Sequence, residues 1–448
     1  MKGYKEYKDS GVEWIGKIPS HWEKIELKHI IKEKITDGPH ETPEFIDEGV
    51  PFLSVDGIVD GDLVFDGCRY ISTKSHNEYI KKCKPEYNDI LFGKSASVGK
   101  VARVKENIEF SVWSPLALIK PDENIVNPVF LEYYLKSNVV KYEIDMASTF
   151  NTQQNVSMDR IKRIKVILPR LEEQYTIARY LDKKTVQIDT LISKKEELIE
   201  NLKASRTKII SETVTKGLDK DVPMKDSGVE WIGEIPKHWS ICKIKHMLEE
   251  GKDGIRMGPF GSNLKLDEMN LEYEYKVYGQ ENLIYQDFEL GDRFINYQKF
   301  STMKQYEVFD GDILISTMGT VGKIDIFNDK YKKGIIDSHL IRVRVNSKLI
   351  SPEYIKLLIN ESKYIKDNLN MQSKGSIMEG LNSTIIKNIV VARPPVSEQI
   401  SITEYITNNV SKIDKLISKT EEQIELLKKA KQKLITEVVT GKIDVTNL

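Results

Sequence analysis

The stretch Lys8 to His29, KDSGVEWIGKIPSHWEKIELKH, occurs a second time at Lys225 to His246, as KDSGVEWIGEIPKHWSICKIKH. The two copies are identical at 15 of 22 positions, so the chain contains an internal duplication. Trp14, Ile15 and Trp22 give the segment an apolar character, and we expect its tryptophans to pack against a neighbouring element.

A second pair of matching segments lies further along each half of the chain. Ile188-Asp-Thr-Leu-Ile-Ser-Lys194 matches Ile413-Asp-Lys-Leu-Ile-Ser-Lys419. Upstream, Pro169 with Glu173-Gln174 matches Pro394 with Glu398-Gln399 at the same offset. The repeated unit is therefore a Trp-containing segment, a variable region and a helical segment, and the whole unit occurs twice.

The helical segments are expected to form two long amphipathic helices. From Glu172 to Lys216, and from about Glu398 to Thr440, neither proline nor glycine occurs, and Gly217 and Gly441 are the expected stops. The narrow apolar seam favours an antiparallel coiled coil of the two copies over two separate helices on separate domains. The predicted seam residues are Ile188, Leu191, Leu198, Leu202 and Ile209 in the first helix, and Ile413, Leu416, Ile424, Leu427 and Leu434 in the second.

The variable regions carry short β-rich runs, punctuated by Gly, Asp and Asn, with helical runs between them. We predict an α+β domain in each, and the shared Asp89-Ile-Leu and Asp312-Ile-Leu motifs indicate one scaffold with diverged loops. The predicted divisions are an N-terminal segment 1–22, a first variable domain 23–168, a central helical region 169–218, the repeated Trp-containing segment 219–239, a second variable domain 240–393 and a C-terminal helical region 394–448.

Composition excludes several classes of protein. The 448 residues are 40% hydrophobic and 30% charged, which excludes a wholly disordered chain. With 67 basic and 68 acidic residues the net charge is -1, which excludes a histone-like polycation but not a basic face. The 3 cysteines lie far apart, and no long apolar run occurs, so we expect a cytoplasmic protein without disulfides or membrane spans.

Two near-identical segments present two near-identical surfaces, which suit two copies of one partner or each other. Two diverged domains on one scaffold suit two different ligands. Duplex DNA fits this layout, because pseudo-twofold proteins match the dyad of the duplex and spaced domains imply spaced half-sites.

The order of motifs resembles that of the specificity (S) subunit of type I restriction-modification enzymes. The resemblance covers essentially the whole chain and is carried by Trp14-Ile-Gly-Lys-Ile-Pro-Ser-His-Trp22, Leu168-Pro-Arg-Leu-Glu-Glu-Gln174, Ile188-Asp-Thr-Leu-Ile192 and their second copies. It implies two α/β target recognition domains separated by a pair of long antiparallel coiled-coil helices. Each domain would read one half of a bipartite, asymmetric DNA site.

The same resemblance implies the partners. Two methyltransferase subunits would dock on the repeated helical regions, and restriction subunits would join them. No cofactor is expected on this chain, because S-adenosylmethionine, ATP and Mg²⁺ would belong to the partner subunits.

Polar and basic loops of the variable regions are the candidate DNA contacts, because Gln and Asn can bind adenine while Lys and Arg can bind guanine or phosphate. An ordinary solvated loop is the alternative for any one residue. The first region contributes Thr36, Asp37, Gly38, His40, Lys94, Ser95, Ser97, Lys100, Asn151, Thr152, Gln153 and Gln154. The second contributes Arg256, Ser262, Asn263, Lys265, Thr317, Thr320, Lys323, Gln372, Lys374 and Ser376.

Catalytic and metal-binding signatures are incomplete throughout the sequence. Asn127-Pro-Val-Phe130 resembles an adenine methyltransferase motif but lacks its second proline and a cofactor-binding companion, so we interpret Pro128 as an early helix position. GxxxxGK[ST] is absent, and no histidine or cysteine spacing suits zinc. We therefore expect a non-catalytic subunit, with a self-sufficient methyltransferase-nuclease and a coiled-coil scaffold for two proteins as the alternatives.

Overall fold

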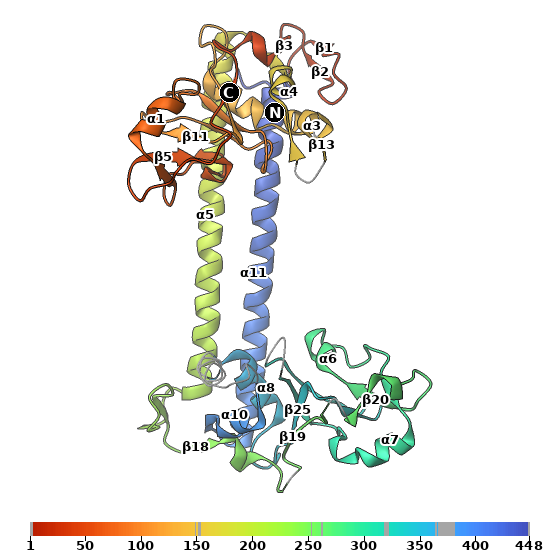
Figure 1. Cartoon of the computed structure of the whole chain (residues 1–448). Helices are drawn as coiled ribbons and strands as arrows, with labels where there is room; N and C mark the ends of the chain where they lie inside the picture. The colour runs from red at the N-terminus through yellow and green to blue at the C-terminus, as the bar shows by residue number, and fades with distance from the viewer. Residues whose placement is uncertain are drawn as a thin grey trace. The chain divides into compact units, whose positions relative to one another are not determined.

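The computed structural model describes residues 3–147, 149–150, 154–251, 253–260, 263–317, 322–362, 365 and 381–446. The chain divides into two compact units (Figure 1). The first unit comprises residues 1–196 with 421–448, and the second comprises residues 197–420. Each unit therefore contains one Trp-containing segment, one variable region, the start of one long helix and the end of the other.

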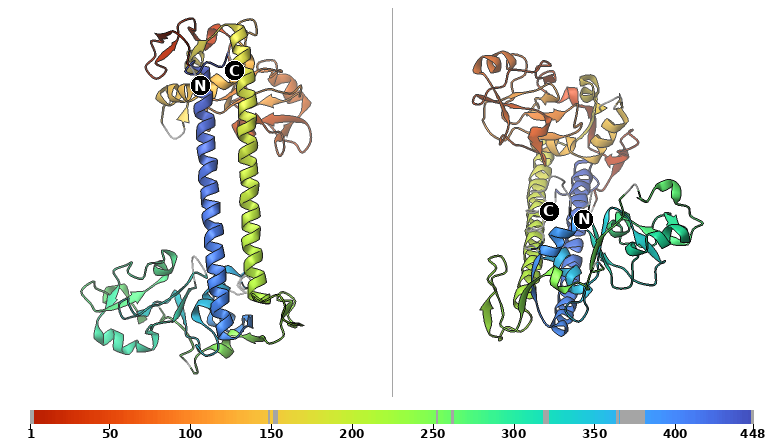
Figure 2. Two further views of the ribbon diagram at one scale, coloured as in Figure 1. Left: turned by 180° about the vertical axis from the view of Figure 1, so that it is seen from behind. Right: turned by 60° about the horizontal axis from the view of Figure 1, so that its bottom comes forward.

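The two predicted long helices are present as α5 (Leu171–Lys216) and α11 (Val396–Val439). Each is continuous in both views of Figure 2. α5 ends before Gly217 and α11 shortly before Gly441, and both glycines have a positive φ, of 76° and 70°. This left-handed conformation ends a helix and favours glycine, which confirms the predicted stops.

Within the first unit the start of α5 pairs with the end of α11. Lys195 Nζ donates to Gln423 Oε1 at 2.6 Å, and Lys431 Nζ donates to Asp189 Oδ2 at 2.6 Å. The earlier residue of α5 contacts the later residue of α11, so the two segments are antiparallel, as predicted.

Within the second unit the end of α5 pairs with the start of α11. Arg206 Nε donates to Asp414 Oδ1 at 2.9 Å, and Arg206 Nη1 lies 2.7 Å from the carboxylate of Glu361. One apolar cluster contains buried side chains of both segments, namely Ile210, Val214, Ile402, Ile406 and Val410.

The predicted seam is wrong at three leucines. Leu191, Leu198 and Leu416 are 49%, 45% and 52% exposed. Each precedes an isoleucine that is better covered, because Ile199 is buried and Ile192 and Ile417 are half-buried. In a Leu-Ile pair both residues are apolar, so periodicity alone could not select the residue that packs. The other seven are buried or half-buried, namely Ile188, Leu202, Ile209, Ile413, Ile424, Leu427 and Leu434.

The first variable region contains two sheets, of order β10-β9-β12-β4 and β11-β5-β8, with β11 parallel to β5. Their strands are β4 (Thr36–Asp37), β5 (Val50–Leu53), β8 (Arg69–Ile71), β9 (Ile90–Gly93), β10 (Val101–Arg103), β11 (Ser111–Val112) and β12 (Leu116–Ile119). Its described residues also include the hairpins β6 (Ile58–Val59) with β7 (Asp62–Leu63) and β13 (Thr149–Phe150) with β14 (Gln154–Asn155), and the α-helices α1 (Thr73–Tyr79), α2 (Pro128–Leu135), α3 (Asn138–Ala147) and α4 (Met158–Lys162).

The second variable region repeats this topology, with sheets of order β19-β25-β22-β23 and β21-β20-β24 and with β24 parallel to β20. Its strands are β19 (Ile255–Met257), β20 (Tyr275–Tyr278), β21 (Phe294–Ile295), β22 (Ile313–Ser316), β23 (Ile324–Ile326), β24 (Gly334–Ile336) and β25 (Leu340–Val343). Its helices include α6 (Gln280–Ile284), α7 (Tyr297–Thr302), α8 (Pro352–Glu361) and α10 (Ser383–Asn388).

Each four-stranded sheet lies between two apolar cores, because successive strand residues point to opposite faces. On β9, Ile90 and Phe92 belong to the core that includes the long helices, whereas Leu91 belongs to a second core. On β22, Ile313 and Ile315 alternate with Leu314 in the same way. Burial on both faces explains the continuous apolar runs in these strands.

The Trp-containing segments form hairpins and adjoining two-stranded sheets, namely β1 (Tyr7–Asp9) with β2 (Lys17–Pro19), β3 (Glu23–Glu26) with β15 (Lys165–Leu168), β16 (Met224–Asp226) with β17 (Glu234–Pro236), and β18 (Ser240–Lys243) with β26 (Val390–Arg393). Trp22 and Trp239 are buried as expected, at 0% and 1% exposure. Trp14 is 38% exposed but packs against α3 as expected, with its ring centroid 5.7 Å from that of Tyr142. The expectation is wrong for Trp231, which is 52% exposed.

The two matching motifs of each unit contact one another. In the first unit the Glu173 carboxylate accepts a hydrogen bond from Trp22 Nε1 at 3.1 Å and lies 3.0 Å from His21 Nε2. In the second unit Glu398 accepts from Trp239 Nε1 at 2.9 Å and lies 2.7 Å from His238. The equivalent histidines are therefore structural, as their repeat positions predict.

The neighbouring glutamine ties each variable region to the start of its long helix. Gln174 is fully buried, accepts from the Asn127 backbone N–H at 2.7 Å, and donates to the carbonyls of Ile125 and Pro169. Gln399 repeats these bonds with Ser351, Leu349 and Pro394.

Asn127 also begins α2. Its side-chain oxygen accepts from the backbone N–H groups of Val129 and Phe130, at 3.0 and 2.9 Å, and Pro128 occupies the first turn. This is helix capping, which confirms the structural interpretation of the Asn-Pro-Val-Phe motif. Among the residues described, no helix is long and apolar enough to cross a membrane.

We predict that Gln174→Ala lowers the free energy of unfolding by about 2–4 kcal/mol, because three backbone groups lose their partner and two of these bonds are buried. Urea denaturation of the full chain measures the change. Gln187→Ala, on the exposed face of α5, is the matched control and should change it by less than about 0.5 kcal/mol. Equal effects of the two variants would show that the buried bonds do not stabilise the first unit.

Candidate nucleic-acid interface

In both variable regions the predicted loops leave one edge of the four-stranded sheet. β4 and β9 end at this edge and β10 and β12 begin there, because Gly93 pairs with Leu116 and Asp37 with Ala117. In the second region β19 and β22 end, and β23 and β25 begin, at the corresponding edge. We call this side of each sheet the loop edge: residues 36–40, 93–100 and 154–156 in the first region, and 256–260, 263–265, 316–317, 322–323 and 337–340 in the second.

The first loop edge brings all three predicted loops together. Lys94 Nζ lies 3.2 Å from Asp37 Oδ2, which joins the loop after β4 to the loop after β9. Ser95 pairs with Asn155, and Val156 N–H donates to the Lys94 carbonyl at 2.8 Å, which joins the β13–β14 hairpin to the same loop. The sequence had placed these loops far apart in the chain. Asn151, Thr152, Gln153 and the side chain of Gln154 lie outside the described residues.

Asp37 is the centre of a cation cluster. Its buried carboxylate lies 2.6 Å from Lys82 Nζ, 3.2 Å from Lys94 Nζ and 3.1 Å from His40 Nε2. Burial would raise the pKa of Asp37, but hydrogen bonds from Lys82 and Lys94 outweigh it and hold the pKa below its ordinary value. The ionised Asp37 therefore positions the lysines and is not itself a group that phosphate would approach.

The remaining predicted residues of the first loop edge differ in accessibility. The side chain of His40 is 72% exposed. Lys100 donates to the Ile58 carbonyl at 2.9 Å and is half-buried, as are Thr36, Ser95 and Ser97. Gly38 is buried and serves as a backbone anchor.

The second loop edge has the same backbone connections. Gly258 N–H donates to the Leu340 carbonyl at 3.0 Å, Thr317 N–H to His339 at 2.9 Å, and Leu381 N–H to Thr317 at 3.2 Å. Leu381 follows the predicted loop of Gln372, Lys374 and Ser376, which lies outside the described residues, as do Ser262 and Thr320.

Thr317 is unsuited to DNA contact as it stands, because it is fully buried and its hydroxyl donates to the His339 carbonyl at 3.0 Å. In the sequence Thr317 lies in a polar loop, and nothing there indicated that its side chain is buried. Asn263, Lys265 and Lys323 are exposed. Arg256 is half-buried on β19, with its guanidinium 6.0 Å from the Tyr306 ring centroid.

The shared scaffold of the two loop edges is a pair of repeated turns. The Gly93 N–H donates to the Lys100 carbonyl and the Ser316 N–H to the Lys323 carbonyl, both at 2.8 Å. A buried aspartate precedes each turn, with Lys120 Nζ 2.7 Å from Asp89 and the Arg344 guanidinium bidentate to Asp312 at 2.7 Å. The motifs shared in sequence are thus scaffold, as predicted.

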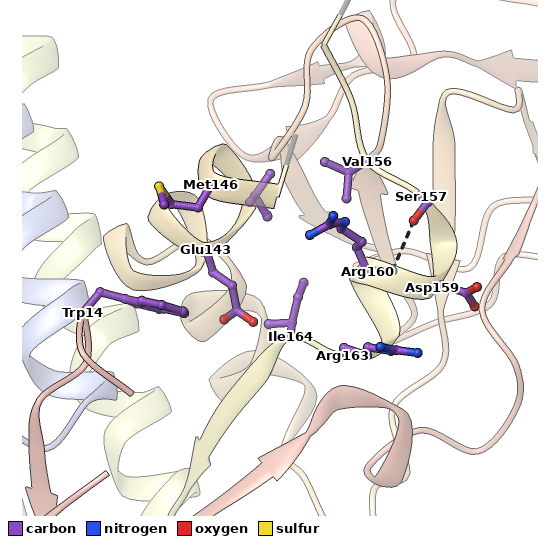
Figure 3. A pocket seen from close by; sticks show the side chains of 10 residues that line it. Trp14, Glu143, Met146, Val156, Ser157, Asp159, Arg160, Arg163 and Ile164 are labelled. Carbon is purple, nitrogen blue, oxygen red and sulfur yellow. Dashed lines mark hydrogen bonds between the residues drawn. The ribbon is translucent and has the colours of Figure 1, made fainter. Parts of the chain in front are cut away.

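Next to the first loop edge lies a cavity of about 540 Å³ that the sequence did not indicate (Figure 3). Trp14 and Met146 border it on one side, and Arg160 and Arg163 on the other (Figure 3). Glu143 points into it from α3 and accepts a hydrogen bond of 3.3 Å from the Lys165 backbone N–H. The basic run of residues 160–163 after the β13–β14 hairpin was the available signal. Among the described residues no cluster of His, Cys, Asp and Glu could hold a metal ion.

The family model of the type I restriction modification DNA specificity domain matches residues 19–201 and 259–426. A protein of Methanocaldococcus jannaschii with the provisional name type I restriction enzyme MjaX specificity subunit is 28% identical, over 99% of each chain. The type I restriction enzyme MjaVIII specificity subunit of that organism is 25% identical, over 96% of this chain and 95% of the relative. The EcoKI specificity subunit of Escherichia coli K12 is 21% identical, over 96% and 90%.

Two solved structures share the fold. A chain from a study of complex assembly and conformational transition of the type I R-M system has a TM-score of 0.70 and 14% identity, with coverage of 95% of this chain and 99% of that chain. The HsdS subunit from Thermoanaerobacter tengcongensis has a TM-score of 0.57 and 15% identity, with coverage of 95% and 98%. With the two long helices and the two matched regions, they confirm the predicted α+β fold.

We predict a pH-dependent stability from Glu143. Burial raises its pKa to about 7 from an ordinary 4.5, so between these values the folded chain binds more protons there than the unfolded chain. The free energy of unfolding therefore falls as the pH rises through this window. Glu143→Gln should remove this contribution, so calorimetry should find its Tm rising relative to the parent chain between about pH 5 and about pH 8.

Asp145→Asn, which removes an exposed carboxylate from the same helix, is the matched control. A difference in Tm between Glu143→Gln and the parent chain that stays constant with pH would contradict the assignment.

Proposed function

This chain belongs to the type I restriction-modification DNA specificity family, and we propose that its variable regions are target recognition domains that each read one half of a split, asymmetric DNA site. As a member of this family it is a non-catalytic, DNA sequence-recognition subunit of a type I restriction-modification system, as predicted. The observation that carries the proposal is the convergence of separate polar loops at the loop edge of both domains.

The side chains at the two loop edges suit two kinds of DNA contact, to phosphates and to base edges. Lysines such as Lys82, Lys265 and Lys323 would contact phosphates and orient the domain on the duplex, while polar groups such as His40 and Asn263 would reach base edges. Because the scaffold is repeated and the loops differ, two unlike sequences can be bound in one way. The predicted contacts Asn151 to Gln154 and Gln372 to Ser376 stay part of the proposal.

The duplicated segments fit two copies of one partner. Trp14 and Trp231 are exposed, and each loop is held by the same bonds: Ser10 N–H to Gly16, and Ser227 N–H to Gly233, at 3.0 Å. An exposed tryptophan on a fixed loop is typical of a binding hot spot. We propose that two methyltransferase subunits dock through these segments and the long helices, and that restriction subunits join that complex.

The cofactors follow from this division of labour. S-adenosylmethionine would bind the methyltransferase partners, and ATP and Mg²⁺ the restriction partners, with none on this chain. A subunit that reads chromosomal and incoming DNA would work in the cytoplasm.

Exchange of residues 30–165 for the corresponding domain of another family member should change one half of the methylated sequence and leave the other half as it was. The reason is that each domain has its own cores and loop edge. Methylome sequencing of cells that carry the exchanged gene is the measurement. A change in both halves would contradict independent recognition, and no adenine-methylation motif lost on gene deletion would contradict the function itself.

Lys323→Ala should weaken DNA binding by the reconstituted methyltransferase complex and reduce the slope of log affinity against log salt by about 1, because one phosphate contact is lost. Lys330→Ala is the matched control, since Lys330 is exposed beyond the opposite end of β23, with Nζ 4.8 Å from the Tyr331 ring centroid. The proposal for Lys323 fails if both variants keep the parental slope.

A further inference from the structure

The loop after β19 presents a bare aromatic ring at the second loop edge. Phe260 is 81% exposed, and the neighbouring Met257 is 42% exposed. A phenylalanine ring left in water gains nothing for the fold, so its position calls for another explanation.

The backbone beneath this ring is fixed. An added Cβ at Gly258 would lie 1.7 Å from the Asp337 carbonyl oxygen, so only glycine allows this close approach. Gly258 N–H donates to the Leu340 carbonyl, Pro259 is buried, and Asn263 N–H donates to the Phe260 carbonyl at 2.8 Å. The ring therefore projects from a fixed point of the sheet, as a residue that enters a ligand must.

The first domain has the same anchor but a different tip. An added Cβ at Gly38 would also lie 1.7 Å from a carbonyl oxygen, that of Val112, and His40 is the projecting residue after Gly-Pro. In the first domain the projecting side chain is a polar imidazole, and its Nε2 lies 3.1 Å from the buried carboxylate of Asp37. The second domain thus carries apolar side chains where the first carries an ionic cluster.

An apolar side chain at a DNA interface can enter between two base pairs, unstack them and bend the duplex. The energy of this deformation depends on the base step, so it contributes to specificity without hydrogen bonds to base edges. The exposed Lys265 and Lys323 on the same loop edge can hold the flanking phosphates while the ring enters.

We propose that Phe260 is a wedge that enters between two base pairs of the half-site read by the second domain, and that this domain selects its half-site in part by how readily that step unstacks. The proposal rests on the proposed function and adds a mode of recognition to it. It also makes the domains unlike in mechanism, since His40 would read its half-site by polar contact.

The test uses the methyltransferase complex reconstituted with the full chain, and duplexes with 2-aminopurine at successive positions of both half-sites. Apart from the adenines that the methyltransferase subunits extrude for methylation, the parent complex should raise the fluorescence at one step of one half-site, where the ring unstacks the base. Phe260→Ala should abolish this rise and weaken binding by about 10-fold or more, in line with the loss of one stacked ring. Phe260→Leu keeps apolar bulk and should retain part of both effects.

Tyr297→Ala is the matched control. Tyr297 is 66% exposed in the same domain, but its ring lies 6.2 Å from that of Tyr275, at the other end of β20 from Asp337. This variant should bind and unstack DNA as the parent does.

The outcomes separate the wedge from the function. Sequence-dependent binding by the parent complex, with unchanged affinity and fluorescence in Phe260→Ala, would overturn the wedge and leave the recognition function in place. A parent complex without sequence-dependent binding would overturn the recognition function, and the wedge with it.

Discussion

A glutamate–glutamine pair at the start of each long helix, in which the glutamine is fully buried, connects the Trp-containing segment, the variable region and the helix of its unit. Glu173 accepts a hydrogen bond from the indole N–H of Trp22, and Gln174 accepts one from the backbone N–H of Asn127 in the variable region. Both bonds join residues that are distant in sequence, and both are repeated in the second unit. Because buried polar groups left without partners cost more than paired ones gain, this contact fixes the position of each domain on its helix.

The duplicated domains share their sheet topology and differ in the side chains at the loop edge. The sheets, the turn after β9 or β22 and the aspartate before it are the same in both, since their backbone groups are paired. At the loop edge the first domain carries the Asp37 cluster and the second carries Phe260. Because the backbone hydrogen bonds of the scaffold do not depend on the loop side chains, those side chains can be substituted without a loss of stability.

The sequence predicted the duplication, the long helices, their glycine stops and the family, because repeats and periodicity are written in adjacent residues. It could not choose between Leu191 and Ile192, since both are apolar, and it could not foresee that Thr317 is buried. Lys82 escaped notice because its partner Asp37 is 45 residues away. Phe260 was not selected from the sequence as a DNA contact, because an apolar residue in a loop is expected to pack inside the fold and only the structure shows that its ring is exposed.

The most direct test of the loop edges is hydrogen–deuterium exchange of the reconstituted methyltransferase complex, with and without its own DNA sequence. Binding should slow amide exchange at residues 36–40 and 93–100 in the first domain and at 256–265 and 317–323 in the second. A scrambled duplex should slow it less. Protection confined to other surfaces of the two domains, with these segments unchanged, would contradict recognition through the loop edges.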